Sequence, residues 1–143
     1  QKVKVRYGLE TLAGVEWIQA GVFYLSEWRA PANGLEASFT ARDVFEYLLN
    51  TPYTGRTSGT LKQIAQEAFE ISGVPSDVRI ELSDALESYS ADLPENSSFT
   101  CAEIVQMCAN AASCIIRQDR YGTLHVERLN TADSDYVIGA ALA

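Results

Sequence analysis

Three short stretches of the chain have the composition of a helix start followed by an amphipathic helix. In each, a threonine precedes an acidic residue or a glutamine by three positions: TARD (40–43), TLKQ (60–63) and TCAE (100–103). This spacing is that of a capping box, in which the threonine oxygen accepts from a first-turn amide and the third side chain reaches back to the cap residue. The three stretches therefore predict three helix starts.

Each predicted start leads into apolar residues three and four positions apart, the spacing of one buried helix face. Pro52 is expected to end the first helix, and Gly73 with Pro75 the second. The expected buried faces are Ala41, Val44, Phe45, Leu48 and Leu49; Leu61, Ile64, Ala65, Ala68 and Ile71; and Cys101, Ile104, Val105, Cys108, Ala111 and Ala112. The second and third helices also align at an offset of 40 residues, with four identities in 17 positions. Similar helix-start chemistry alone explains such a match, and an internal repeat is the alternative.

The N-terminal forty residues have the pattern of strands. Residues 1–7 alternate polar and apolar, and 15–28 are rich in aromatic and β-branched residues, so we expect one or two strands there with a bulge or bend at Ala20-Gly21. APANG (30–34) predicts a turn, and GLEASFTA (34–41) a returning strand.

Further short strands are expected between and after the helices. DVRIEL (77–82) reads as a strand, and 89–98 as a polar loop. CIIRQ (114–118), DRYG and TLHVERL (123–129) predict a hairpin whose turn needs positive φ at Gly122. Residues 130–143 are expected to form a last strand or a tail.

These elements predict an α+β fold, an antiparallel sheet of short strands and a C-terminal hairpin packed with three capped amphipathic helices. We expect residues 1–143 to form a single domain, strand-rich over 1–40 and built of helices and the hairpin over 41–143. The chain starts at Gln1 rather than Met, and we expect it to be a fragment of a longer protein.

Composition argues against two classes of partner. The net charge is −8, with 19 acidic and 11 basic residues and no cluster of Lys and Arg suited to a duplex, so we expect no nucleic acid. No apolar run approaches the roughly 18–20 residues that span a bilayer, so we expect no membrane partner. An odd number of cysteines, three, fits a reducing compartment or simple burial.

The candidate metal ligands and the candidate nucleophile lie in sequence contexts that do not suit these roles. Cys101, Cys108, Cys114 and His125 are separated by six, five and ten residues, whereas structural zinc sites place two ligands two to four residues apart. Cys101 follows a helix cap and could be an activated nucleophile, but Glu103 opposes the lowering of its pKa. We therefore expect no metal, no cofactor and no catalytic residue.

Two side-chain groups leave alternatives open. The carboxylates of Glu46, Glu67, Glu70 and Glu103 lie off the apolar helix faces, and a hydrolase would need two of them to converge. On the return strand of the hairpin, His125 shares a face with Thr123 and Glu127, so we expect polar surroundings for it.

Three aromatic residues near the N-terminus are the candidate binding residues. Trp17, Tyr24 and Trp28 lie in a strand-rich region, where aromatic side chains most often belong to the core. The alternatives are a protein interface and a platform on which a carbohydrate stacks.

The order of these segments resembles that of bacteriophage or prophage tail-tip or baseplate hub proteins, the tail-associated structural proteins, in their central region. The matching stretches extend over roughly 14–128. They are WIQAGVFYLSEW, SFTARDVFEYL with its Ala41-Arg42-Asp43 helix start, TPYTG, TLKQIAQEAFEISGV and CIIRQDRYGTLHV with its Asp119-to-Gly122 hairpin turn.

The resemblance implies a structural subunit of the virion tail, made in the bacterial cytoplasm and assembled with other tail or baseplate proteins. It implies a homo-oligomer, a trimer or hexamer, and not an enzyme. The alternatives are a carbohydrate- or cell-wall-binding module of the same kind of particle, using Trp17, Tyr24 and Trp28, and a cell-wall hydrolase.

Overall fold

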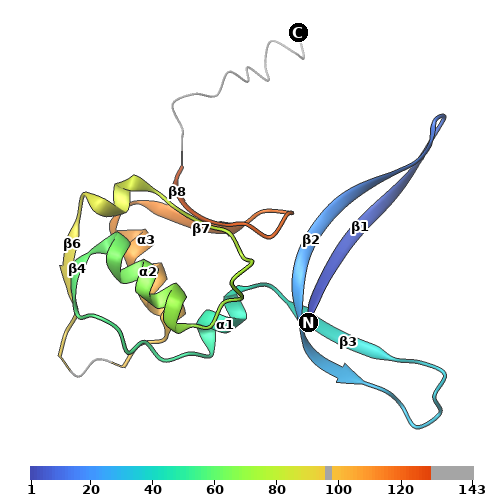
Figure 1. Cartoon of the computed structure of the whole chain (residues 1–143), viewed down its shortest axis with the longest axis horizontal. Coiled ribbons are helices and arrows are strands. Elements are labelled where there is room, and N and C mark those ends of the chain that lie inside the picture. Colours follow the sequence, from blue (N-terminus) through green and yellow to red (C-terminus); the bar gives the residue numbers. More distant parts are fainter. Residues whose placement is uncertain (96–97, 130–143) are drawn as a thin grey trace.

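The computed structural model describes residues 1–95 and 98–129, which form two parts (Figure 1). Residues 1–42, called the arm here, contain the antiparallel strands β1 (Lys2–Thr11), β2 (Gly14–Arg29) and β3 (Ser38–Arg42), in the order β1-β2-β3. Residues 43–129, called the body, contain the helices and the remaining strands. Figure 1 shows β1 and the first half of β2 projecting away from the body as a two-stranded ribbon.

The arm contains the bulge that the sequence predicts. Val5 pairs with Gly21 and Arg6 pairs with Gln19, so Ala20 has no partner on β1. An extra residue in one strand of an antiparallel pair bends that strand and increases its twist. The predicted turn at 30–34 is also confirmed, since Gly34 has a φ of 66° and its amide donates to the Pro31 carbonyl oxygen.

Helices and one core make up most of the body. The helices are α1 (Phe45–Leu49), α2 (Leu61–Ile71) and α3 (Cys101–Ala111), with a 3₁₀ turn η1 at Asp84–Glu87. α2 and α3 pack against each other. The core side chains with no exposed surface are Val44, Leu48, Ile64, Ala65, Ala68, Leu86, Cys101, Ile104 and Ala109.

Two small sheets complete the body. β4 (Ser58–Thr60) pairs antiparallel with β6 (Ser90–Asp92), and the other sheet has the order β5-β8-β7, formed by β5 (Ile80–Leu82), β8 (Leu124–Arg128) and β7 (Cys114–Gln118). The α+β class and the β7–β8 hairpin are confirmed, with a φ of 89° at Gly122. The described strands are distributed over three sheets rather than one, and β5 pairs with β8 in parallel. β6 lies in the stretch that the sequence predicts to be a loop.

The three predicted helix starts have three different outcomes. Thr60 forms a complete capping box with Gln63. Thr100 accepts from the Glu103 amide, and its hydroxyl donates to the Glu103 carboxylate at 3.3 Å. The prediction that Thr40 caps the first helix is wrong, because Thr40 lies in β3 and pairs with Glu27.

The first helix begins later than the sequence predicts and is therefore short. α1 begins at Phe45 with Val44 as its N-cap, and Asp43 Oδ1 accepts from the Phe45 amide at 3.1 Å. Leu49 is 59% exposed rather than buried, because a five-residue helix ends before its second apolar row can pack.

The faces of the two longer helices are mostly as expected. Phe69 of α2 is buried while Ile71 is half-buried, and on α3 Ala109 is buried in place of Ala111. Among the described residues, no helix has the length and apolarity needed to cross a membrane. The strand or tail expected at 130–143 lies outside the described residues.

Candidate protein-interaction surface

The arm exposes an unusual number of large apolar side chains. Of fifteen such exposed residues in the described chain, ten lie within residues 1–39. They are Val5, Tyr7, Leu9, Leu12, Val15, Trp17, Ile18, Trp28, Leu35 and Phe39. Single exposed apolar residues are normal on a protein surface, but a concentration of them in one element is typical of an interaction site.

The pairing of β1 with β2 places apolar side chains on both faces of the ribbon. Directly paired residues of antiparallel strands share a face, so Tyr7 and Ile18 lie on one face. Trp17 pairs with Gly8 on the other face. Neither face of this ribbon is covered by a second layer (Figure 1), so the apolar side chains of both remain open to a partner.

Gly8 provides the space for the Trp17 indole. A Cβ atom at Gly8 would lie 3.1 Å from Trp17 Cζ3. Because that separation is tighter than most carbon contacts, a larger residue at position 8 would require the indole to shift by a few tenths of an ångström. The glycine therefore lets the Trp17 ring approach the neighbouring strand closely.

The three aromatic residues proposed for binding do not form one site. Tyr24 is buried in the body core, with its ring edge-to-face with Tyr47 at 5.6 Å. Trp17 and Trp28 are 65% and 61% exposed, so the expectation of burial is wrong for both. They are eleven residues apart on β2, about 35 Å of extended chain at roughly 3.3 Å per residue. One bound ligand of small size cannot stack on both.

Polar contacts fix the base of the arm to the body. Gln118 Nε2 donates to the Val22 carbonyl oxygen at 3.0 Å, and Gln118 Oε1 accepts from the Val44 amide at 3.3 Å. Lys2 Nζ lies 2.6 Å from Asp77 Oδ2. The half of the arm beyond this base therefore projects from a part that is held to the body.

The cysteines that were candidates for metal or nucleophile chemistry are core residues. Cys101, Cys108 and Cys114 are free and buried. Burial raises the pKa of all three thiols, that of Cys108 to about 11, which disfavours the thiolate needed by a ligand or nucleophile. Within residues 1–95 and 98–129, no three His, Cys, Asp or Glu side chains are grouped so that they could hold a metal ion.

His125 lies between carboxylates, and its predicted polar surroundings are confirmed. Its Nε2 is 2.9 Å from Asp119 Oδ2, and its Nδ1 is 3.2 Å from Glu81 Oε2 and 3.9 Å from Glu127 Oε2. Burial raises the pKa of Asp119, but hydrogen bonds from His125 and from the Thr123 and Tyr121 amides outweigh it, and the net shift is downward. The carboxylates bind opposite ring nitrogens, which suits a structural clamp on the hairpin turn.

The four helix carboxylates considered for hydrolysis have separate neighbours. Glu46 lies 3.5 Å from Arg42, and Glu67 accepts from Arg56 at 3.0 Å. Glu103 belongs to the α3 cap. The contacts therefore tie these three to different partners, and Glu70 lies on the rim of a groove described next.

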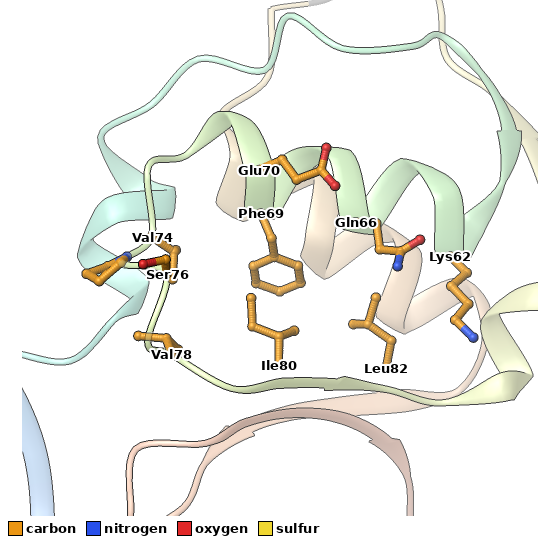
Figure 2. Close-up of a pocket in the computed structure, with 10 residues that line it drawn as sticks. Lys62, Gln66, Phe69, Glu70, Val74, Ser76, Val78, Ile80 and Leu82 are labelled. Atoms are coloured by element: carbon orange, nitrogen blue, oxygen red, sulfur yellow. The ribbon is translucent and has the colours of Figure 1, made fainter.

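A groove of about 370 Å³ lies between α2 and β5 (Figure 2). Figure 2 shows Phe69 pointing from α2 toward Ile80, with Ile80 and Leu82 rising from β5. Lys62 and Glu70 lie on the polar rim. The sequence indicated Ile80 and Leu82 as strand residues, but not that their strand would form one wall of a groove.

Comparison with known proteins yields a likeness of fold. No family model matches the chain, and no curated protein matches it. Among solved structures, it is similar to the 43 kDa tail protein of prophage MuSo2 from Shewanella oneidensis, with a TM-score of 0.55 and 15% identity. The match covers 84% of this chain and 38% of that protein, so the chain spans well under half of its neighbour's length. At this identity the likeness shows a shared fold, and the neighbour is of the general class that the sequence resembles.

Proposed function

We propose that this chain is a structural building block of a phage or prophage tail, not an enzyme, and that its place is in the tail tip or baseplate hub. The shared fold with a prophage tail protein and the independent resemblance in segment order support this role. The proposal places the chain in the virion tail, in contact with other tail or baseplate proteins.

The observation that carries the proposal is the uncovered apolar arm. A two-stranded ribbon is marginally stable alone in water, and three or more strands or a packed layer are usually needed. Beyond its base, the arm has neither, yet it carries Tyr7, Leu9, Trp17 and Ile18 exposed. A partner that covers these side chains would supply the missing layer, as assembly into a larger particle does.

Localisation in particles tests this proposal. Antibodies raised against this chain are applied to intact phage particles produced from the genome that encodes it, and gold labels are located by electron microscopy. The proposal expects the label at the tail, concentrated at its distal end. Label on the capsid, or particles with normal tails that lack the polypeptide by mass spectrometry, would overturn it.

A carbohydrate- or cell-wall-binding module is the second candidate function. The exposure of Trp17 and Trp28 favours it, because indole rings open to solvent can stack on sugar rings. Titration calorimetry with peptidoglycan fragments tests it, using wild type and the Trp17→Ala and Trp28→Ala variants. Heat of binding that either substitution removes supports this function, and no heat with any fragment excludes it for those ligands.

A further inference from the structure

We propose that the groove between α2 and β5 receives strand β1 from the arm of a second copy of this chain. This inference rests on the proposed function, since it names a partner for the assembly surface. Such a contact requires an open edge on β5, a strand whose side chains match those of β5, and an open edge on that strand as well. The structure provides all three.

The edge of β5 is open. Among the described strands, β5 has β8 as its one neighbour. The Arg79 carbonyl oxygen accepts from the Leu124 amide at 2.9 Å, and the Ser83 amide donates to the Val126 carbonyl oxygen at 2.8 Å. Because backbone groups alternate along a strand, residues 80 and 82 direct their N–H and C=O groups away from β8. An added strand would find these groups ready to pair.

The side chains of β5 form an apolar-acidic-apolar pattern. Ile80 and Leu82 face α2 and form the groove with Phe69 (Figure 2). Because side chains alternate along a strand, Glu81 lies on the opposite face of β5. The Glu81 side chain is 45% exposed although it contacts Arg79 and His125. A matching strand therefore needs apolar residues on its groove side and a cation opposite Glu81.

β1 carries the complementary pattern. Val5, Arg6 and Tyr7 read apolar-basic-apolar, and Val5 and Tyr7 are exposed on one face of the arm. With Arg6 opposite Glu81, Val5 and Tyr7 align with the two groove residues of β5 whichever way the strand runs. Among the described strands, β1 has β2 as its one neighbour, so its outer edge is open as well.

The distribution of charge favours the same pairing. The arm (1–42) carries five basic and four acidic residues, whereas the body (43–129) carries six basic and thirteen acidic ones. The arm of one copy is therefore attracted to the body of another rather than to a second arm. Such a contact joins two different surfaces, so it is head-to-tail and each copy can both give and receive a strand.

A charge-swap experiment on the whole chain tests the inference. Sedimentation velocity over a concentration series is measured for wild type, for Arg6→Glu, for Glu81→Arg, and for an equal mixture of the two variants. Each variant alone has like charges at the contact, and we expect its self-association to weaken about tenfold or more. In the mixture, the arm of the Arg6→Glu variant meets the β5 edge of the Glu81→Arg variant, and the charges at that contact are again opposite. Association should therefore return to within a few-fold of wild type.

The matched controls are Arg29→Glu and Glu36→Arg, which make the same charge changes at exposed positions outside the contact. They should associate as wild type does. A mixture no stronger than its components, or a wild type that stays monomeric at millimolar concentration, overturns the inference. If association is insensitive to both swaps but is lost on Trp17→Asp, the strand contact is wrong while the arm remains an assembly surface. The location of gold label on particles is independent of all these results.

Discussion

The side-chain amide of Gln118 donates a hydrogen bond to the carbonyl oxygen of Val22 at 3.0 Å, across 96 positions of sequence. The oxygen of the same Gln118 side chain accepts a hydrogen bond from the backbone amide of Val44. One side chain at the end of β7 therefore joins the arm to the body and to the residue before α1. Val22 and Val44 are both buried, so no solvent can replace these bonds without rearrangement.

Replacing Gln118 by alanine should destabilise the chain by about 1–3 kcal/mol, because a buried amide and a buried carbonyl group lose their partner. Urea unfolding measures the change. Gln106→Ala is the matched control, since Gln106 is exposed on α3 and pairs with Asn110; its effect should stay within about 0.5 kcal/mol. Equal effects of the two substitutions would show that Gln118 does not hold the arm.

Thr60→Ala should cost about 1 kcal/mol of folding free energy, because Thr60 caps α2 in a complete capping box. Thr40→Ala should cost distinctly less, because Thr40 is an exposed residue of β3 and caps no helix. Thermal unfolding of the two variants compares them. A larger effect at Thr40 would contradict the strand assignment of residues 38–42.

Gly122→Ala should destabilise the chain more than Gly34→Ala. Both glycines have positive φ, which costs an alanine about 1–2 kcal/mol. At Gly122 the added Cβ would also lie 3.1 Å from Val22 Cβ, whereas at Gly34 no heavy atom lies within 4 Å. Unfolding free energies of the two variants measure the difference, and an equal cost would mean that the hairpin turn does not contact the arm.

Acid should weaken the clamp around His125. The pKa of Asp119 in the folded chain lies below its ordinary value of 3.8. Its contribution to stability is therefore complete above that value and is lost as the pH falls through the folded-state pKa. Asp119→Asn should lower stability at neutral pH and flatten the fall in stability below about pH 4. Unfolding measured from pH 7 to pH 2 tests this, and parallel curves for the two proteins would contradict it.

The thiols should resist modification while the chain is folded. Burial raises the pKa of Cys108 to about 11. The contribution of this protonated thiol to folding stability is therefore complete below the ordinary value of 9.0 and is lost as the pH rises toward 11. A chromogenic disulfide reagent at pH 8 should react slowly with the native chain and rapidly with three thiols in denaturant. Rapid reaction of Cys101 in the native chain would revive the nucleophile hypothesis.

The sequence predicted those elements whose signals are local. The cap at Thr60, the turn at Gly34 and the hairpin turn at Gly122 each depend on residues within a few positions of one another. They formed where the spacing of residues predicted them.

Elements that depend on distant partners were not predicted. Thr40 has the local chemistry of a cap, but pairing with Glu27 draws it into β3. β6 spans three residues and exists because β4 pairs with it, and the parallel register of β5 depends on a strand more than forty residues away. Three-residue strands carry too few side chains to show an alternating pattern.

The candidate surface was only partly predictable for a related reason. Alternation of polar and apolar residues indicated strands in the arm, but it cannot show whether a second layer covers them. Trp17 and Trp28 were therefore expected in the core and are exposed, while Tyr24 on the same strand is buried. The role of Gln118 has no sequence signal, because its two partners lie 96 and 74 positions away.

Photo-cross-linking from the arm tests the central claim most directly. A photoreactive phenylalanine analogue is placed at Trp17 of this protein, particles are assembled and irradiated, and cross-linked polypeptides are identified by mass spectrometry. The same analogue at the exposed α3 position Gln106 serves as the control. We predict that Trp17 cross-links in assembled tails to another copy or to a different tail polypeptide, and that the unassembled protein at low concentration gives no such product. Intact tails in which Trp17 gives no intermolecular cross-link would contradict the claim that the arm is an assembly surface.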